Sequence, residues 1–89
     1  MEEDIRETRE WKEQMLAARI SQAKAKIHSI EAFTRQLYLG GESAKIAAKE
    51  IRERRQALKD IQVIAENLAK DLGKTDFSWS KALQEEKGS

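Results

Sequence analysis

The side chains of this sequence that come nearest to a metal-binding pair are its only histidine and a glutamate three residues later. His28 and Glu31 would share one face of a helix. Helical bundles that hold two metal ions take such a pair from each of two helices, together with further inward carboxylates, and the second half of this chain has no histidine. The chain also lacks cysteine. We therefore predict no metal site and no cofactor.

The residue types present also give no support for nucleophilic catalysis. A serine nucleophile needs a neighbouring base that is held in place by a third group, and His28 is expected to face outward beside Ile27. The pair Gly40-Gly41 lacks the glycine spacing and the following lysine of a phosphate-binding loop. The sequence therefore predicts a protein that is not an enzyme.

Basic side chains are concentrated in the middle of the chain. Residues 17–60 carry ten basic and five acidic side chains, a net charge of +5, whereas residues 1–16 carry −3 and residues 61–89 carry −1. If the chain folds back on itself, one end becomes basic and the other acidic. The basic end predicts nucleic-acid contact, since neutralised phosphates release counterions. The candidate contacts are Lys24, Lys26, Lys45, Lys49, Arg52, Arg55 and Lys59.

Two other interpretations account for the same charges. Glu50 and Glu53 interrupt the densest basic cluster, and pairs such as Glu50 with Arg54 are typical of a solvated helix surface. The polarity also fits a two-fold dimer of head-to-tail hairpins, with the basic end of each against the acidic end of the other.

The elements that would position these residues are two long helices. Apolar residues recur at alternating spacings of three and four on both sides of Gly40-Gly41, and the chain contains no proline. The pattern predicts a helix over about 4–38 capped by Asp4, a turn over 39–43 closed by Gly40, and a helix over about 44–72 with Ser43 as its N-cap and Gly73 just beyond its end.

A turn at the glycine pair makes facing residue numbers sum to about 81. This register places large residues opposite small ones, as in Leu37 with Ala44 and Leu16 with Ala65. Arg54 then occupies a seam position opposite Ile27. Its methylenes would cover apolar neighbours with the guanidinium outward, or the charge would fix the register of the pair.

Near the open end of the hairpin, the seam positions facing Leu68 and Leu72 are the charged residues Glu13 and Arg9. Something else must therefore cover the apolar residues there. We predict a short helix over about 76–86, capped by Thr75 or Asp76, that folds across this end and gathers Trp11 and Trp79 into one cluster.

Composition sets the remaining bounds. The chain has 89 residues, of which 37% are charged and 39% hydrophobic, so it forms one domain with little apolar material for a core. The N-terminus is acidic and no apolar run approaches the ~18 residues of a membrane span, which predicts a cytoplasmic protein without membrane contact.

The sequence thus predicts an all-α fold: an antiparallel two-helix coiled-coil hairpin with a short third C-terminal helix, assembling as a helical-bundle dimer. The predicted function is a non-enzymatic protein-protein interaction module, such as an adaptor, chaperone, inhibitor or assembly subunit, with no small-molecule substrate. The alternative is a nucleic-acid-binding accessory or regulatory protein, in which Phe33 and Tyr38 beside the turn would stack on bases instead of packing. The predicted protein-binding residues are Trp11, Met15, Phe33, Ile46, Ile64 and Trp79.

Overall fold

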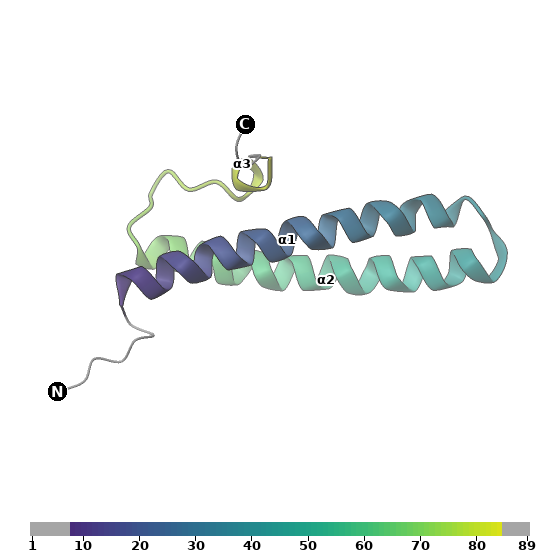
Figure 1. The fold of residues 1–89 in the computed structure, drawn as a ribbon, viewed down its shortest axis with the longest axis horizontal. Helices are drawn as coiled ribbons and strands as arrows, with labels where there is room; N and C mark the ends of the chain where they lie inside the picture. Colours follow the sequence, from purple (N-terminus) through teal and green to yellow (C-terminus); the bar gives the residue numbers. More distant parts are fainter. Residues whose placement is uncertain (1–7, 85–89) are drawn as a thin grey trace.

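The computed structural model describes residues 8–84, which form a helical hairpin crossed at one end by a short helix (Figure 1). The elements are α1 (Arg9–Leu37), α2 (Gly41–Asp71) and α3 (Trp79–Gln84). α1 and α2 run antiparallel and pack along their length, which confirms the predicted all-α hairpin with a third helix. Within residues 8–84, no helix combines the length and the hydropathy that a membrane span requires.

The first helix begins later than predicted. Thr8 is extended, with φ −72° and ψ 147°, and its Oγ1 accepts a hydrogen bond of 3.1 Å from the backbone N–H of Trp11. A threonine in this conformation satisfies one of the free N–H groups at a helix start, so it sets the first helical residue at Arg9. The predicted start near Asp4 is therefore wrong, and Asp4 itself lies outside the described residues.

Two glycines make the turn between the long helices. Gly40 has φ 71° and Gly41 has φ 61°, a region that other residues rarely adopt. Because these two residues already reverse the chain, α2 begins at Gly41 with Gly40 as its N-cap, and Ser43 falls inside the first turn. The prediction of Ser43 as the N-cap is thus wrong. The Ser43 carbonyl instead accepts a hydrogen bond of 3.2 Å from Gln36 Nε2, which ties the two sides of the turn together.

The second helix ends as predicted, on a left-handed glycine. Gly73 has φ 74°, its N–H donates to the Lys70 carbonyl at 3.0 Å, and the N–H of Lys74 donates to the Ala69 carbonyl at 2.9 Å. This pair of bonds is the Schellman closure of a helix. The chain is still turning at Thr75, so the prediction that Thr75 or Asp76 caps the third helix is wrong. Ser78 takes that role, because its Oγ accepts from the Lys81 N–H at 3.3 Å.

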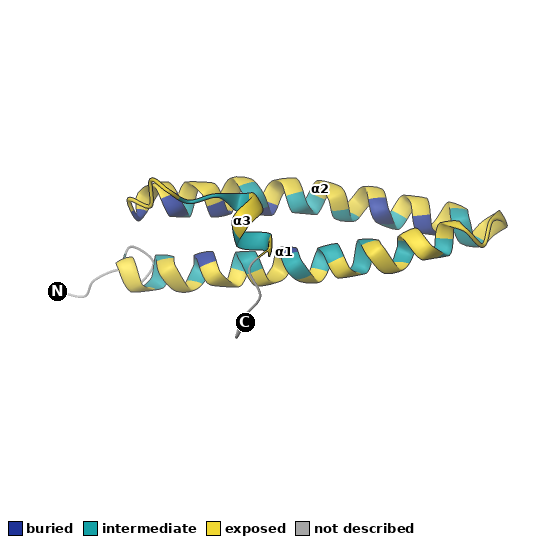
Figure 2. Ribbon diagram, turned by 90° about the horizontal axis from the view of Figure 1, so that it is seen from above, coloured by how far each residue is buried: buried dark blue, intermediate teal, exposed yellow. Residues whose placement is uncertain are grey.

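The seam between α1 and α2 is built on alanine. Ala23, Ala47 and Ala65 are completely buried, whereas the larger seam residues keep part of their surface exposed. The predicted register is confirmed near the open end: Leu16 and Ala65 belong to one buried cluster, and Arg9 Nη1 donates to the Leu72 carbonyl at 3.2 Å. Figure 2 shows the buried residues along the facing sides of the two helices.

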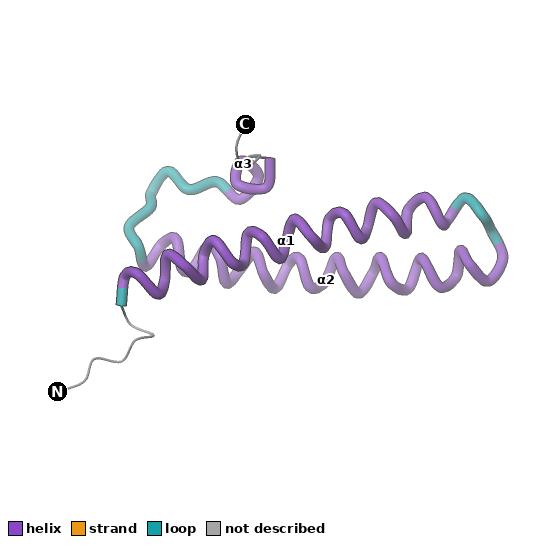
Figure 3. Tube along the Cα trace, in the orientation of Figure 1, coloured by secondary structure: helices purple, strands orange, loops and turns teal. Residues whose placement is uncertain are grey.

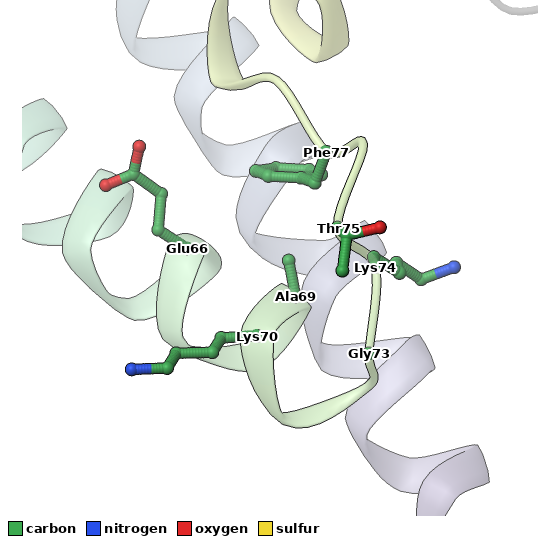
Figure 4. A pocket seen from close by; sticks show the side chains of 7 residues that line it. All are labelled: Glu66, Ala69, Lys70, Gly73, Lys74, Thr75 and Phe77. Carbon is green, nitrogen blue, oxygen red and sulfur yellow. The ribbon is translucent and has the colours of Figure 1, made fainter.

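The segment after α2 folds back over the open end, as predicted. Phe77 and Trp79 pack against a cluster formed by Leu16, Ala65, Ala69 and Leu72, together with Ile20 and Leu68. Figure 4 shows Phe77 beside Ala69, with Glu66 and Lys70 lining the same pocket. The tube in Figure 3 shows the loop that carries the chain from the end of α2 to α3. The folded-back segment therefore supplies apolar surface that the charged seam positions of α1 lack.

If the buried alanines set the distance between the long helices, an Ala65→Leu substitution forces them apart. We expect it to lower the free energy of unfolding by about 1–3 kcal/mol, the usual cost of overpacking a seam. Chemical denaturation followed by circular dichroism measures this loss. Ala18→Leu adds the same methylenes at an exposed position of α1 and serves as the control. Equal stability of the two variants would contradict the close approach.

Candidate functional site

The third helix covers only one side of the hairpin. In Figures 1 and 2, α3 lies over one face of the α1 and α2 pair. The segment leading to it passes Glu66, Ala69 and Lys70 on α2. A residue two positions away on a helix is turned by about 200°, so Ile64 points away from the side of Glu66. Among residues 8–84, no other segment covers the side turned away from α3, and we call it the open face.

Five of the six predicted protein-binding residues fall on this open face. On α1, Trp11, Met15 and Phe33 follow spacings of four and eighteen, which return to one side of a helix. On α2, Ile46 and Ile64 are also eighteen residues apart. Ile46 is 55% and Ile64 43% exposed, while the three residues of α1 are half-buried. Each wall of the face thus carries apolar residues near its two ends.

The sixth residue lies elsewhere. Trp79 packs against the buried cluster under α3, whereas Trp11 is not part of that cluster and lines a small hollow with Thr8, Glu10 and Gln14. The predicted common cluster of Trp11 and Trp79 is therefore wrong. Its physical reason is helical phase: Trp11 is turned by roughly 140° from the seam residue Leu16, away from the side on which α3 packs.

Arg54 connects the two walls of the open face. Its Nε donates to Ser29 Oγ at 2.7 Å, its Nη1 contacts the Glu50 carboxylate and donates to the Glu50 carbonyl at 3.3 Å, and its Cζ lies 4.7 Å from the centre of the Phe33 ring. The side chain is 27% exposed. The expected Glu50 pair is confirmed. The guanidinium does not simply point outward but holds α1 and α2 together beside the seam.

A second surface is made by basic residues on the side opposite the open face, towards the turn. Arg52 and Arg55 line a hollow of about 380 Å³ whose other residues are Thr34, Leu37, Ala48 and Ile51. Lys24 and Lys59 fall on the same side by helical phase. Arg52, Arg55 and Lys59 form no ion pair within residues 8–84, so their charges are not neutralised there. We call this the basic face.

The remaining predicted nucleic-acid contacts are not brought to this face. Lys26 lines a different hollow, of about 320 Å³, with Gln22, Ser29 and Arg54 on the open face. Lys45 pairs with Glu42 at 3.5 Å on the outer side of α2, and Lys49 lies one turn further along that side. Of the seven predicted nucleic-acid contacts, four therefore lie on the basic face and three do not.

Sequence reasoning missed one residue on each face. Arg35 lies eleven positions after Lys24, a spacing of slightly more than three full turns, so it belongs to the basic face. Arg19 lies four residues after Met15 and belongs to the open face, where its Nη1 donates to Gln22 Oε1 at 2.7 Å. Both residues could have been assigned from the sequence, since their helical spacing from Lys24 and from Met15 places each on its face.

The His28 and Glu31 pair is an exposed contact on the surface of α1. His28 Nδ1 lies 3.5 Å from Glu31 Oε1, and both side chains are largely exposed. Within residues 8–84, no three side chains of the metal-ligating types come together. The hydroxyls of Ser29 and Ser78 are engaged by Arg54 and by the start of α3. The two surfaces described above are therefore the candidate functional sites.

Comparison with known proteins identified no relative of this chain. No protein-family model, curated protein or solved structure matches the chain.

Because Arg54 joins the two helices beside the seam, Arg54→Ala is expected to lower the free energy of unfolding by about 1–3 kcal/mol. It removes the hydrogen bond to Ser29 and the contact with Phe33, and leaves Glu50 without its partner. Denaturant titration measures the change. The matched control is Arg52→Ala, an exposed arginine two residues away, for which we expect a change within about 0.5 kcal/mol. Similar losses in both would argue against a connecting role.

Proposed function

We propose that this chain is a non-enzymatic module that binds protein through its open face. The observation that carries the proposal is the set of apolar residues left uncovered by α3, with Ile46 and Ile64 at the ends of one wall and Met15 and Phe33 at the ends of the other. Burying these residues against a partner removes apolar surface from water, at about 25 cal/mol per Å². Apolar and aromatic residues of this kind form the desolvated centres of protein interfaces.

The packing of the two helices beneath the open face also supports binding. The walls of the open face belong to helices of 29 and 31 residues that are held together by the buried seam and by Arg54. A partner would therefore meet a surface that needs little ordering on association, which reduces the entropic cost of binding. This favours an adaptor or assembly subunit over a chain that folds only on its partner.

The test compares the wild-type chain with a double variant, Ile46→Glu and Ile64→Glu, as bait in extracts of its own cells. Charges on the open face should abolish capture of partner proteins while circular dichroism stays unchanged. Val63→Glu is the control, because Val63 is 58% exposed but faces the outer side of α2. The proposal fails if all three baits retain the same proteins.

A second candidate function, nucleic-acid binding, is favoured by the basic face. Arg52 and Arg55 line an apolar hollow there, Lys24 and Lys59 lie on the same side by helical phase, and Tyr38 is 87% exposed at the turn. Cationic side chains that follow a phosphate backbone, together with an exposed aromatic ring that stacks on a base, are the usual elements of single-strand binding.

For this second candidate we expect the triple variant Arg52→Glu, Arg55→Glu and Lys59→Glu to lose binding to single-stranded DNA and RNA probes. The wild-type affinity should fall steeply with salt, because each neutralised phosphate contributes about −0.7 to the slope of log affinity against log salt. Lys26→Glu lies on the open face and should retain binding. Fluorescence anisotropy at several salt concentrations gives both quantities. Unchanged anisotropy of the probes at low salt would remove this candidate.

A further inference from the structure

We propose that the open face binds the open face of a second copy of this chain, with the two-fold axis parallel to the long axis of the hairpin, so that both turns lie at the same end. This inference rests on the proposed function of the open face and names its partner. It departs from the head-to-tail arrangement that the polarity of the sequence predicts.

The α1 wall of the open face carries basic residues between two apolar ones. Met15, Arg19, Lys26 and Phe33 follow one another at spacings of four and seven, which keep them on one side of the helix. Arg19 and Lys26 form no ion pair within residues 8–84, and Lys26 lines the hollow beside Arg54. This wall therefore presents positive charge flanked by apolar ends.

The α2 wall carries the opposite charge in the same pattern. Ile46, Glu53, Asp60 and Ile64 recur at spacings of seven, seven and four. Glu53 and Asp60 form no ion pair within the described part of the chain, and Asp60 accepts only a hydrogen bond of 3.2 Å from Gln56 Nε2 on its own helix. Lys49 precedes Asp60 by eleven residues, so it lies within about 20° of Asp60 at the outer edge of the same wall. The two acidic side chains still give this wall a net negative charge, flanked by apolar ends.

A two-fold axis parallel to the helices brings the two patterns into register. The rotation places α1 of one copy over α2 of the other without changing the level along the axis. Since facing residues sum to about 81, as Arg9 and Leu72 do, Lys26 then lies level with Glu53 and Ala57 of the second copy. By the same rule Arg19 meets Asp60, and the apolar ends meet as Met15 with Ile64 and Phe33 with Ile46.

An axis perpendicular to the helices, the head-to-tail arrangement, opposes like charges. That rotation places α1 over α1 and α2 over α2, so that Lys26 and Arg19 face the same basic wall and Glu53 and Asp60 face the same acidic wall. Like charges across an interface disfavour the arrangement. The distribution of charge across the face therefore selects the parallel axis.

The basic ends do not prevent the two turns from lying together. Arg52, Arg55, Lys59 and Lys24 lie on the side opposite the open face, so in the dimer they point outward. Two packed layers of helices, each about 10 Å thick, separate the two basic faces. This distance exceeds the Debye length of about 8 Å at physiological salt, and their repulsion is largely screened.

The first test is a charge swap, measured as the dimer dissociation constant by sedimentation over a concentration series. Lys26→Glu and Glu53→Lys should each weaken the dimer by about tenfold, because each turns two symmetry-related attractions into repulsions. The double variant should return close to the wild-type constant, since its charges are exchanged. Lys59→Glu changes the net charge equally on the opposite face and should leave the constant unaffected.

The second test uses the absence of native cysteine. Lys26→Cys and Glu53→Cys, made in separate chains, should form a disulfide-linked heterodimer when mixed under oxidising conditions, and little covalent dimer when kept apart. Strong cross-linking of Lys26→Cys with itself would overturn the proposed axis. A wild-type chain that stays monomeric at every concentration would overturn the dimer. In either case the proposed function stands or falls separately, on whether capture of partners depends on Ile46 and Ile64.

Discussion

The arrangement of this molecule depends on a seam in which small residues of one long helix lie opposite larger residues of the other. Ala23, Ala47 and Ala65 have no exposed surface, and Ala65 packs with Leu16 of the other long helix in one buried cluster. Two helices enclose only the side chains that point from one helix towards the other. Ile46 and Ile64 each precede a buried alanine by one residue, a turn of about 100° away from the seam, and they keep about half of their surface exposed. The same packing that stabilises the hairpin therefore also creates the surface through which it is proposed to act.

The third helix makes the two sides of the hairpin different. Phe77 and Trp79, in the segment after Gly73, cover the seam on one side of the open end. Arg9 and Glu13 occupy seam positions of α1 there, so α1 offers few apolar contacts of its own. Covering one side leaves the other available, and the charges divide in the same way. Arg52 and Arg55, which form no ion pair within residues 8–84, lie on the basic face, while Arg54 is held between Ser29, Glu50 and Phe33. The two candidate functions thus belong to opposite surfaces and do not compete for residues.

Much of this fold could be predicted from sequence, because long-range periodicity is a property of many residues at once. The 3-4 spacing and the glycine pair are sufficient to specify the hairpin and its register. Helix ends depend on single residues, and the sequence contains more than one possible cap near each end. Among the described residues, Thr8 caps α1, Gly40 caps α2 where Ser43 was predicted, and Ser78 caps α3 where Thr75 or Asp76 was predicted. Membership of a face lies between these cases. Helical spacing alone places Trp11, Met15 and Phe33 on one side of α1, but only the position of α3 showed that Trp79 lies on the other side of the hairpin.

The position of Arg54 shows why charge on this chain must be assigned by face and not by segment. Counted along the sequence, residues 17–60 form one basic block, which favours a hairpin that meets its partner head to tail. In the structure, Arg54 is neutralised by Glu50 beside the seam, and Lys26 lies across the hairpin from Arg52 and Arg55. The open face then becomes a pair of oppositely charged walls with apolar ends. Because an interface responds to the charges that directly face it over a few ångströms, this local pattern outweighs the polarity of the whole chain.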